Sequence, residues 1–388
     1  MAASKSAPER WPADRGRVAQ IASELVAITS VNPALGGSDG GEARVAERIG
    51  ALCSAIGCEV DFEEVLPARP NVIASLHRDD SYPTLVIEGH TDTVAAPSVE
   101  LLTPRIDGGR LVGRGACDTK GGIAAALHAL ERLAAIDIRL NVRFVGTIDE
   151  EVAFRGVTHY LRYHPHADAA IVIEPTLLVP VVAHGGVMRG ELRAEGRAVH
   201  SATPELGENA ITALAEAIPG VASWAEQREP HEHELCGRTS FSVTTIRGGT
   251  GINTIPAECV AEFDWRLHPS DDAETARAAL VAHLAESTPH VSLATVFLLD
   301  GGLDLDVGEP LVAAARAACA RITGNTEVAG LRANTDASKF ARAGIPAIVL
   351  GPGSLAQAHT AEEWIEIEEL ARAAELYVAL CLGFAGAR

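Results

Sequence analysis

Short apolar runs that each lead to a polar residue alternate with helical patterns along this chain, and they constrain its fold most strongly. The runs at 84–88, 142–147, 169–173 and 345–350 are rich in β-branched residues and precede His90, Glu150, Glu174 and His359, respectively. Such runs, separated by helices, predict an α/β fold with a mixed, mainly parallel sheet flanked by helices. Ligands bind in the crevice outside the carboxyl ends of such strands, so we expect these side chains to meet there.

Imidazoles and carboxylates gathered in one crevice would be desolvated and would repel one another unless a cation lay between them. The candidates are His90, Asp92, Asp118, Glu150, Glu151, Glu174 and His359. They offer nitrogen and oxygen atoms without thiolate, which suits zinc and leaves cobalt or manganese possible. The sequence therefore predicts a site for two divalent metal ions.

Several of these residues also have a plain structural interpretation, and His359 could be a residue of a loop or of a helix start. Asp92 can cap a turn, and Asp118 can cap the helix expected over 121–135. The acidic run at 149–151 can be a solvated turn, but it follows a buried strand. Since adjacent glutamates point in different directions, Glu150 or Glu151 could bind an ion while the other acts as a general base on water. A bound ion lowers the pKa of that water to about 7.

Composition excludes several classes of function and sets the number of domains. A chain of 388 residues exceeds one typical core, so two domains are expected. The net charge, 32 − 52 = −20, opposes binding to nucleic acid or to an anionic membrane. No apolar run reaches the ~20 residues of a membrane span. The start lacks a signal-peptide core, and the seven cysteines form no CxxC pair, so we expect reduced thiols and a cytoplasmic location.

Between residues 185 and 300 the pattern changes from α/β to α+β. The expected elements are a strand at 187–195, a helix at 209–227, strands at 239–247 and 259–268, a helix at 272–287 and a strand at 291–298. This βαββαβ order is typical of the ferredoxin-like unit. The sequence thus predicts a discontinuous catalytic domain, 1–184 with 301–388, and an inserted domain, 185–300.

Two polar residues of the insert could contact a substrate. His200 stands at a strand end and could polarise a carbonyl, and Arg266 could bind a carboxylate through two hydrogen bonds. Alternatively, His200 is a surface loop residue and Arg266 a solvated charge on a strand.

Together with Gly196–Ser201 and Asn253–Pro256, these motifs resemble the M20 family of metallopeptidases and amidohydrolases, from about Ala19 to Glu363. Acetylornithine deacetylase and succinyl-diaminopimelate desuccinylase belong to this family. The resemblance implies that the inserted domain serves as a lid and forms a homodimer. It also implies a site for two zinc ions. His90 and Glu174 would bind one zinc, Glu151 and His359 would bind the other, and Asp118 would bridge them.

The resemblance further implies roles around the ions. Asp92 would orient His90, and Glu150 would deprotonate the water and then protonate the leaving amine. His200 would stabilise the oxyanion, reaching the site from the partner subunit in dimeric relatives, while Asn253 and Arg266 would bind the substrate's carboxylate. In the family, the peptide bond after the bridging aspartate is often cis, although Thr119 stands here where methionine is common.

The expected activity is therefore hydrolysis of the amide bond of a small N-acyl-L-amino acid, as in a deacetylase or desuccinylase. Two alternatives stay open at this point. One is a dipeptidase or aminopeptidase that uses the same ions, and the other is a metal-binding protein without catalytic activity. Nucleic acid and membrane are not expected as partners.

Overall fold

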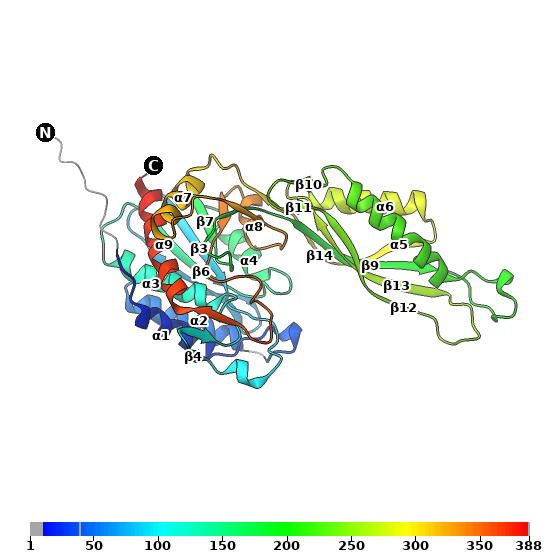
Figure 1. The fold of residues 1–388 in the computed structure, drawn as a ribbon, viewed down its shortest axis with the longest axis horizontal. Helices are drawn as coiled ribbons and strands as arrows, with labels where there is room; N and C mark the ends of the chain where they lie inside the picture. Colours follow the sequence, from blue (N-terminus) through cyan, green and yellow to red (C-terminus); the bar gives the residue numbers. More distant parts are fainter. Residues whose placement is uncertain (1–10, 39, 387–388) are drawn as a thin grey trace. The chain divides into compact units, whose positions relative to one another are not determined.

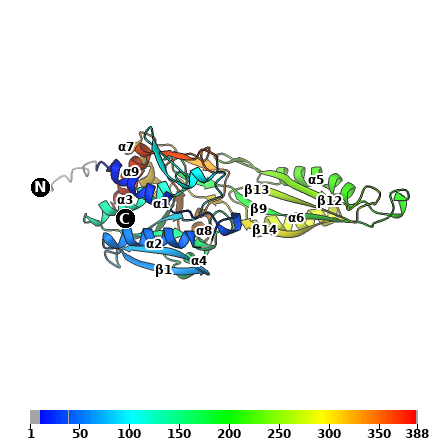
Figure 2. The ribbon, with the colours of Figure 1, turned by 90° about the horizontal axis from the view of Figure 1, so that it is seen from below.

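A computed structural model describes residues 11–38 and 40–386 of the chain, which form two compact units (Figures 1 and 2). The first unit comprises the described residues up to Val182, Leu305–Val328, and those from Thr335 onward. The second comprises Ala183–Asp304 and Ala329–Asn334. The predicted insert at 185–300 falls inside this second unit, which also takes in 329–334. A Cβ atom at Gly330 would lie 2.7 Å from the backbone of Leu235, so this short segment packs closely on the insert.

The first unit contains most of the helices. They are α1 (Arg15–Val26), α2 (Gly41–Ala55), α3 (Lys120–Ala134), α4 (Arg155–Tyr163), α7 (Pro310–Ile322), α8 (Ala337–Arg342) and α9 (Ile367–Gly386), with short 3-10 turns at Pro33–Leu35 and Val99–Leu102. Among the described residues, none of the helices combines the length and apolar character that crossing a bilayer requires.

The central sheet of the first unit is mixed, and its middle strands are parallel. In spatial order its strands are β1 (Glu59–Leu66), β2 (Arg69–Leu76), β6 (Asn141–Thr147), β3 (Thr84–His90), β7 (Ala169–Val172) and β17 (Ala347–Val349). Strands β6, β3, β7 and β17 pair in parallel, whereas β1 and β2 extend the sheet antiparallel. The predicted α/β class is confirmed. A separate small sheet joins β4 (Arg105–Asp107), β5 (Arg110–Val112) and β18 (Trp364–Glu366).

Helices cover both faces of the central sheet, as the near-continuous burial of β3 and β6 requires. A Cβ atom at Gly146 of β6 would lie 3.5 Å from Ile49 of α2. Three residues earlier on the same strand, Arg143 donates a hydrogen bond to the hydroxyl of Tyr160 on α4 (3.1 Å). Because side chains alternate along a strand, α2 and α4 lie on opposite faces. The carboxyl ends of β3, β6 and β7 are thereby left for polar residues.

The second unit has the βαββαβ order predicted from the sequence. Its elements are β9 (Gly186–Glu195), α5 (Ala210–Gln227), β12 (Ser240–Gly248), β13 (Glu258–Leu267), α6 (Ala273–Ser287) and β14 (Val291–Asp300), beside the 3-10 turn Pro204–Leu206 and the short strands β10 (Glu232–His233), β11 (Gly237–Arg238), β15 (Leu303–Asp304) and β16 (Ala329–Leu331). Strand β8 (Val181–His184) leads into this unit. The sheet order β12-β13-β9-β14, antiparallel throughout, is that of the predicted ferredoxin-like fold.

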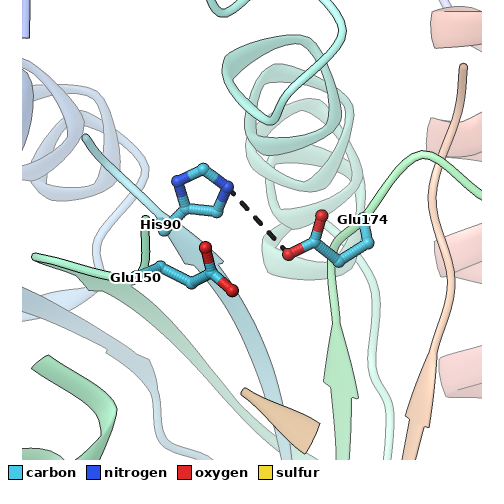
Figure 3. A group of neighbouring side chains, drawn as sticks. All are labelled: His90, Glu150 and Glu174. Atoms are coloured by element: carbon cyan, nitrogen blue, oxygen red, sulfur yellow. Dashed lines mark ion pairs between the residues drawn. The ribbon is translucent and has the colours of Figure 1, made fainter. Parts of the chain in front are cut away.

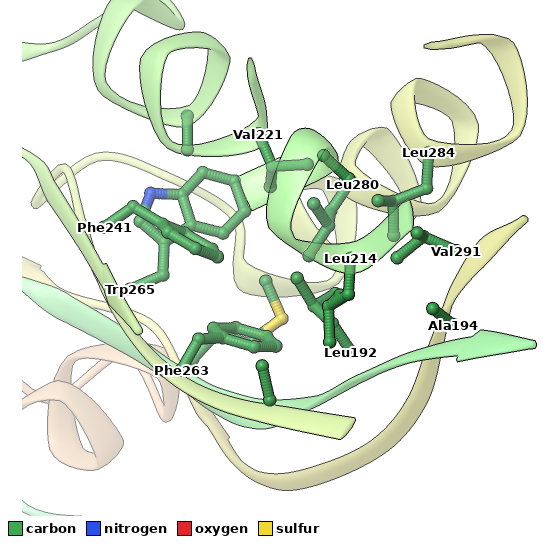
Figure 4. Packing of buried hydrophobic residues seen from close by; sticks show 14 of the residues in the cluster. Leu192, Ala194, Leu214, Val221, Phe241, Phe263, Trp265, Leu280, Leu284 and Val291 are labelled. Carbon is green, nitrogen blue, oxygen red and sulfur yellow. The ribbon is translucent and has the colours of Figure 1, made fainter. Parts of the chain in front are cut away.

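The core of the second unit lies between its sheet and its two helices (Figure 4). Ala261, Phe263, Trp265 and Leu267 are buried, while the intervening residues of β13 are less so, as their alternation predicts. The rings of Phe241 and Phe263 stack with centroids 5.0 Å apart. Each large apolar side chain buried in this way contributes roughly 1.5–3 kcal/mol to folding.

Candidate metal centre

Asp118 lies at the centre of the candidate site, in the loop before α3. Its Oδ1 atom is 3.0 Å from Nε2 of His90, and its Oδ2 atom is 3.3 Å from Nε2 of His359. The two oxygens of one carboxylate therefore face two imidazoles from distant parts of the chain. The Asp118–Thr119 peptide bond is cis, as the family resemblance implies.

His90, the last residue of β3, points Nε2 toward the acidic residues. Nε2 is 4.0 Å from Oε1 of Glu174, which follows β7 (Figure 3). Nδ1 faces Asp92, but the backbone carbonyl of Asp92 is nearer (3.0 Å) than its carboxylate Oδ1 (3.5 Å). The carboxylate of Asp92 instead accepts hydrogen bonds from the backbone N–H groups of Glu150 (3.1 Å) and Glu151 (3.3 Å). Asp92 thus ties the end of β3 to the turn after β6.

Two overlapping sets of possible metal ligands share His90. One consists of His90, Glu150 and Glu174, and the other of His90, Asp118 and Glu151; within each set the ligand atoms lie within 4.8 Å of one another. Figure 3 shows the carboxylates of Glu150 and Glu174 beside the His90 ring. Glu150 is therefore close enough either to bind an ion or to contact a water bound to one.

His359 contacts two members of the second set, Asp118 and Glu151. Its Nε2 atom is 3.2 Å from Oε2 of Glu151, and its side chain is half exposed. Hydrogen bonds to Asp118 and Glu151 raise the pKa of His359 to about 10. The backbone of His359 has φ +60°, in the left-handed region that few residues other than glycine adopt.

The pKa shifts report crowding of negative charge. Burial raises the pKa of Glu150 well above its ordinary value, and the charges of Asp336 and Glu151 add to this against the opposing effect of His90. Burial likewise raises the pKa of Glu174, with a further contribution from Asp118. Carboxylates that are this buried and this close are stabilised as anions by a cation between them. The donor set, oxygen and imidazole nitrogen in two overlapping groups, fits two divalent ions.

A buried polar network supports the acidic turn at 149–151. Asn32 Nδ2 donates to Asp92 (2.7 Å) and to Asp149 (3.0 Å). Arg69 forms ion pairs with Asp149 (3.0 Å) and with Glu42. Asp149 is fully buried and is held by this network, so it lies outside the groups of ligand atoms.

Sequence reasoning missed these supporting residues. Asn32 precedes a proline and looks like an ordinary turn residue, Glu42 lies between Gly41 and Ala43, and Arg69 lies between Ala68 and Pro70, where an arginine is typical of a turn. Glu88 is a separate buried acid near the site, and the sequence does mark it, because it is the one charged residue in the run 84–88. In the structure Glu88 is buried and accepts a hydrogen bond from the hydroxyl of Thr147.

The three site residues predicted in the insert belong to the second unit. His200 is exposed, and its loop pairs with that of Asn253, because Thr254 bridges to His200 and Ser201 N–H donates to the carbonyl of Asn253 (2.9 Å). Arg266, on β13, instead binds Asp264 through Nε (2.7 Å) and Nη2 (3.1 Å). The structure thus brings His200 and Asn253 together and engages Arg266 with an acid of its own strand.

Comparison with known proteins agrees with this geometry. The chain is 26% identical over 356 residues to acetylornithine deacetylase of Aliivibrio salmonicida (88% of this chain, 92% of that protein), and 31% identical over 317 residues to that of Myxococcus xanthus (78% and 81%). Its fold is similar to aminopeptidase PepT of Bacillus cereus (TM-score 0.79, 23% identity, 96% and 99% covered). It is also similar to Bacillus subtilis YXEP, described as a dinuclear metal-binding peptidase from the M20 family (TM-score 0.68, 17% identity, 95% and 97% covered).

Residues 86–383 match the family described as Peptidase family M20/M25/M40, and this stretch contains every predicted ligand. The match covers well over half of the chain. The chain is therefore a metal-dependent hydrolase of amide bonds and belongs to peptidase family M20/M25/M40.

Proposed function

We propose that this protein is a di-metal hydrolase that cleaves the amide bond of a small N-acyl-L-amino acid, with acetylornithine deacetylase or desuccinylase activity as the leading subclass. The observation that carries the proposal is the pair of Asp118 oxygens, each within 3.3 Å of a different histidine. The two relatives named acetylornithine deacetylase support the substrate class.

The proposed ligands divide into two sets around Asp118. His90 and Glu174 would hold one ion and Glu151 and His359 would hold the other, with Asp118 between the two histidines. Nitrogen and oxygen donors without thiolate favour zinc, with cobalt or manganese as substitutes. Divalent ions held by these residues would supply hydroxide near neutral pH, because they would lower the pKa of water.

In the proposed mechanism, Glu150 moves the protons. It removes a proton from the attacking water and delivers it to the nitrogen of the leaving amine as the C–N bond breaks. The half-buried position of Glu150 beside His90 and Glu174 supports this role, because desolvation favours the protonated carboxyl. The products are a carboxylate and a free amino acid.

We further propose that the second unit contributes to substrate binding. His200 stabilises the negative charge that develops on the carbonyl oxygen, and Asn253 and Arg266 bind the carboxylate of the substrate. For Arg266, this requires a substrate carboxylate to share the guanidinium with Asp264.

We also propose that the second unit acts as a lid and forms a homodimer. Strand β12 is an edge of its sheet and carries Ile246, which is 54% exposed. An exposed apolar residue on an unpaired edge favours pairing with a second copy. Light scattering after size-exclusion chromatography tests this, and a monomer at all concentrations contradicts it.

The proposed location is the cytoplasm. All seven cysteines lie within the described residues as buried free thiols, which fits a reducing compartment. The proposed partners are small acyl-amino acids, without nucleic acid or membrane.

A hydrolysis screen tests the activity. Purified protein, stripped of metal and reconstituted with zinc, cobalt or manganese, is incubated with acetyl-, succinyl- and formyl-amino acids, and the released amine is measured. Acetylornithine should be among the substrates cleaved, and the metal-free protein should be inactive. Cleavage of free dipeptides without cleavage of any acyl-amino acid would instead support the dipeptidase or aminopeptidase alternative.

A further inference from the structure

Glu363 is a buried carboxylate that none of the proposed ligand sets includes. It has no solvent exposure, and four donors approach its two oxygens. Oε1 accepts from the backbone N–H groups of Cys117 (2.9 Å) and Asp118 (3.0 Å). Oε2 accepts from the backbone N–H of Gly115 (2.9 Å) and from Nη1 of Arg114 (2.6 Å). These donors occupy the acceptor sites of an ionised carboxylate and offset the cost of burying it.

This carboxylate joins two segments that are far apart in the sequence. One is the loop 113–118, which ends in Asp118, and the other is the segment 359–363, which begins with His359. Backbone contacts reinforce the join, because Gly113 N–H donates to the carbonyl of Glu363 (3.1 Å) and Arg114 Nη2 donates to the carbonyl of Thr360 (3.1 Å). The two segments are therefore held together at both ends of 360–363.

His359 depends on such an anchor more than the other proposed ligands do. Its side chain is half exposed, so packing restrains it little. Its φ of +60° is an unfavourable backbone conformation that its surroundings must maintain. Asp118 belongs to one of the two segments that Glu363 joins, and His359 belongs to the other. A shift of the Glu363 carboxylate therefore changes the distance between the side chains of Asp118 and His359.

We propose that Glu363 is a positioning residue that sets the separation of Asp118 and His359, and thereby the affinity for the ion that these two residues share. The inference rests on the di-metal centre of the proposed function. Glu363 contacts neither substrate nor ion in this scheme and acts through the backbone of Asp118 and the segment that carries His359.

The substitution Glu363→Gln tests this with almost no change in shape. An amide has one acceptor oxygen, so its NH₂ group must face two donors, either Cys117 and Asp118 or Gly115 and Arg114. In either orientation the two segments lose half of their shared anchor. Glu362→Gln is the matched control, because Glu362 is the adjacent residue and is exposed.

The measurement is a titration of the metal-free, full-length protein with Co²⁺, followed by visible absorption and by equilibrium dialysis. Wild type should bind two ions. In Glu363→Gln, the affinity for one ion should fall by about 10–100-fold while the other is retained, as is typical when a group supporting a ligand is removed. The titration should resemble that of His359→Ala, and Glu362→Gln should match wild type.

Glu363→Asp keeps the negative charge at a shorter reach, so it should bind the weakened ion more tightly than Glu363→Gln does. Melting temperatures of the metal-free variants separate loss of metal affinity from loss of fold. The inference is overturned if Glu363→Gln binds both ions as wild type does or weakens both equally. It is also overturned if neither position-363 variant yields folded protein, since Glu363 would then be a general determinant of folding. Wild type that binds no Co²⁺ would overturn the metal centre itself.

Discussion

The substitution Asp92→Asn should weaken both the fold and the metal centre. Asp92 has no solvent exposure. Its Oδ2 accepts from Asn32 Nδ2 (2.7 Å) and from Glu151 N–H (3.3 Å). Its Oδ1 accepts from Glu150 N–H (3.1 Å) and lies 3.5 Å from Nδ1 of His90. One carboxylate thus holds two proposed ligands and the proposed base.

The expected loss in the free energy of unfolding follows from the number of donors whose hydrogen bonds Asp92 accepts. Asparagine has the shape of aspartate, but its NH₂ group must face either the two donors of Oδ2, from Asn32 and Glu151, or the Glu150 N–H that Oδ1 accepted. The less costly orientation loses one hydrogen bond to a charged group, which contributes roughly 1.5–3 kcal/mol, so the free energy of unfolding should fall by about that amount. The metal affinity should fall by about 10–100-fold, because His90 and Glu151 lose their common support.

Urea denaturation of the metal-free protein measures the first effect, and metal analysis after dialysis measures the second. Asp61→Asn is the control, because Asp61 is exposed on β1 and its substitution should change stability by less than about 0.5 kcal/mol. If Asp92→Asn unfolds within about 1 kcal/mol of wild type and keeps its ions, the reasoning about this carboxylate is wrong.

Three further predictions concern catalysis, stability and metal removal. Glu150→Gln should lower kcat by about 10²–10⁴-fold with unchanged metal content, as measured by steady-state kinetics and metal analysis. Activity that persists in this variant would show that Glu150 is not the general base. Arg69→Met leaves Glu42 buried without its cation, while Asp149 keeps Arg155 (2.9 Å), so urea denaturation should register a loss of about 3–5 kcal/mol, and an unchanged midpoint would contradict it. Adding metal to the metal-free protein at about 100 times its Kd should stabilise the fold by roughly 2.7 kcal/mol. A melting temperature that is the same with and without metal would argue against a bound ion.

Local patterns predicted much of the fold. The alternation along β13 predicted which residues are buried, because a strand places successive side chains on opposite faces. Asn209 and Asp272, where the predicted helices begin, cap α5 and α6 through hydrogen bonds to backbone N–H groups. Gly57 follows the end of α2 and has φ +87°, a backbone conformation that favours glycine.

The supporting residues could not be predicted in this way, because their roles depend on contacts across the chain. Glu362 and Glu363 are adjacent acids that look alike in sequence, yet the first is exposed and the second is buried against the Asp118 loop. Arg69 meets Asp149 across 80 residues of sequence. The segment 329–334 joins the second unit through packing on Leu235. Its strand β16 has only three residues, which is too short for a sequence pattern to predict that contact.

The most direct test of the account is a crystal structure of the zinc-reconstituted protein with anomalous data collected at the zinc edge. We predict two anomalous peaks, one contacted by His90 and Glu174, the other by Glu151 and His359, with Asp118 touching both. A single peak, no peak, or Glu150 bound to zinc in place of Glu151 would contradict it.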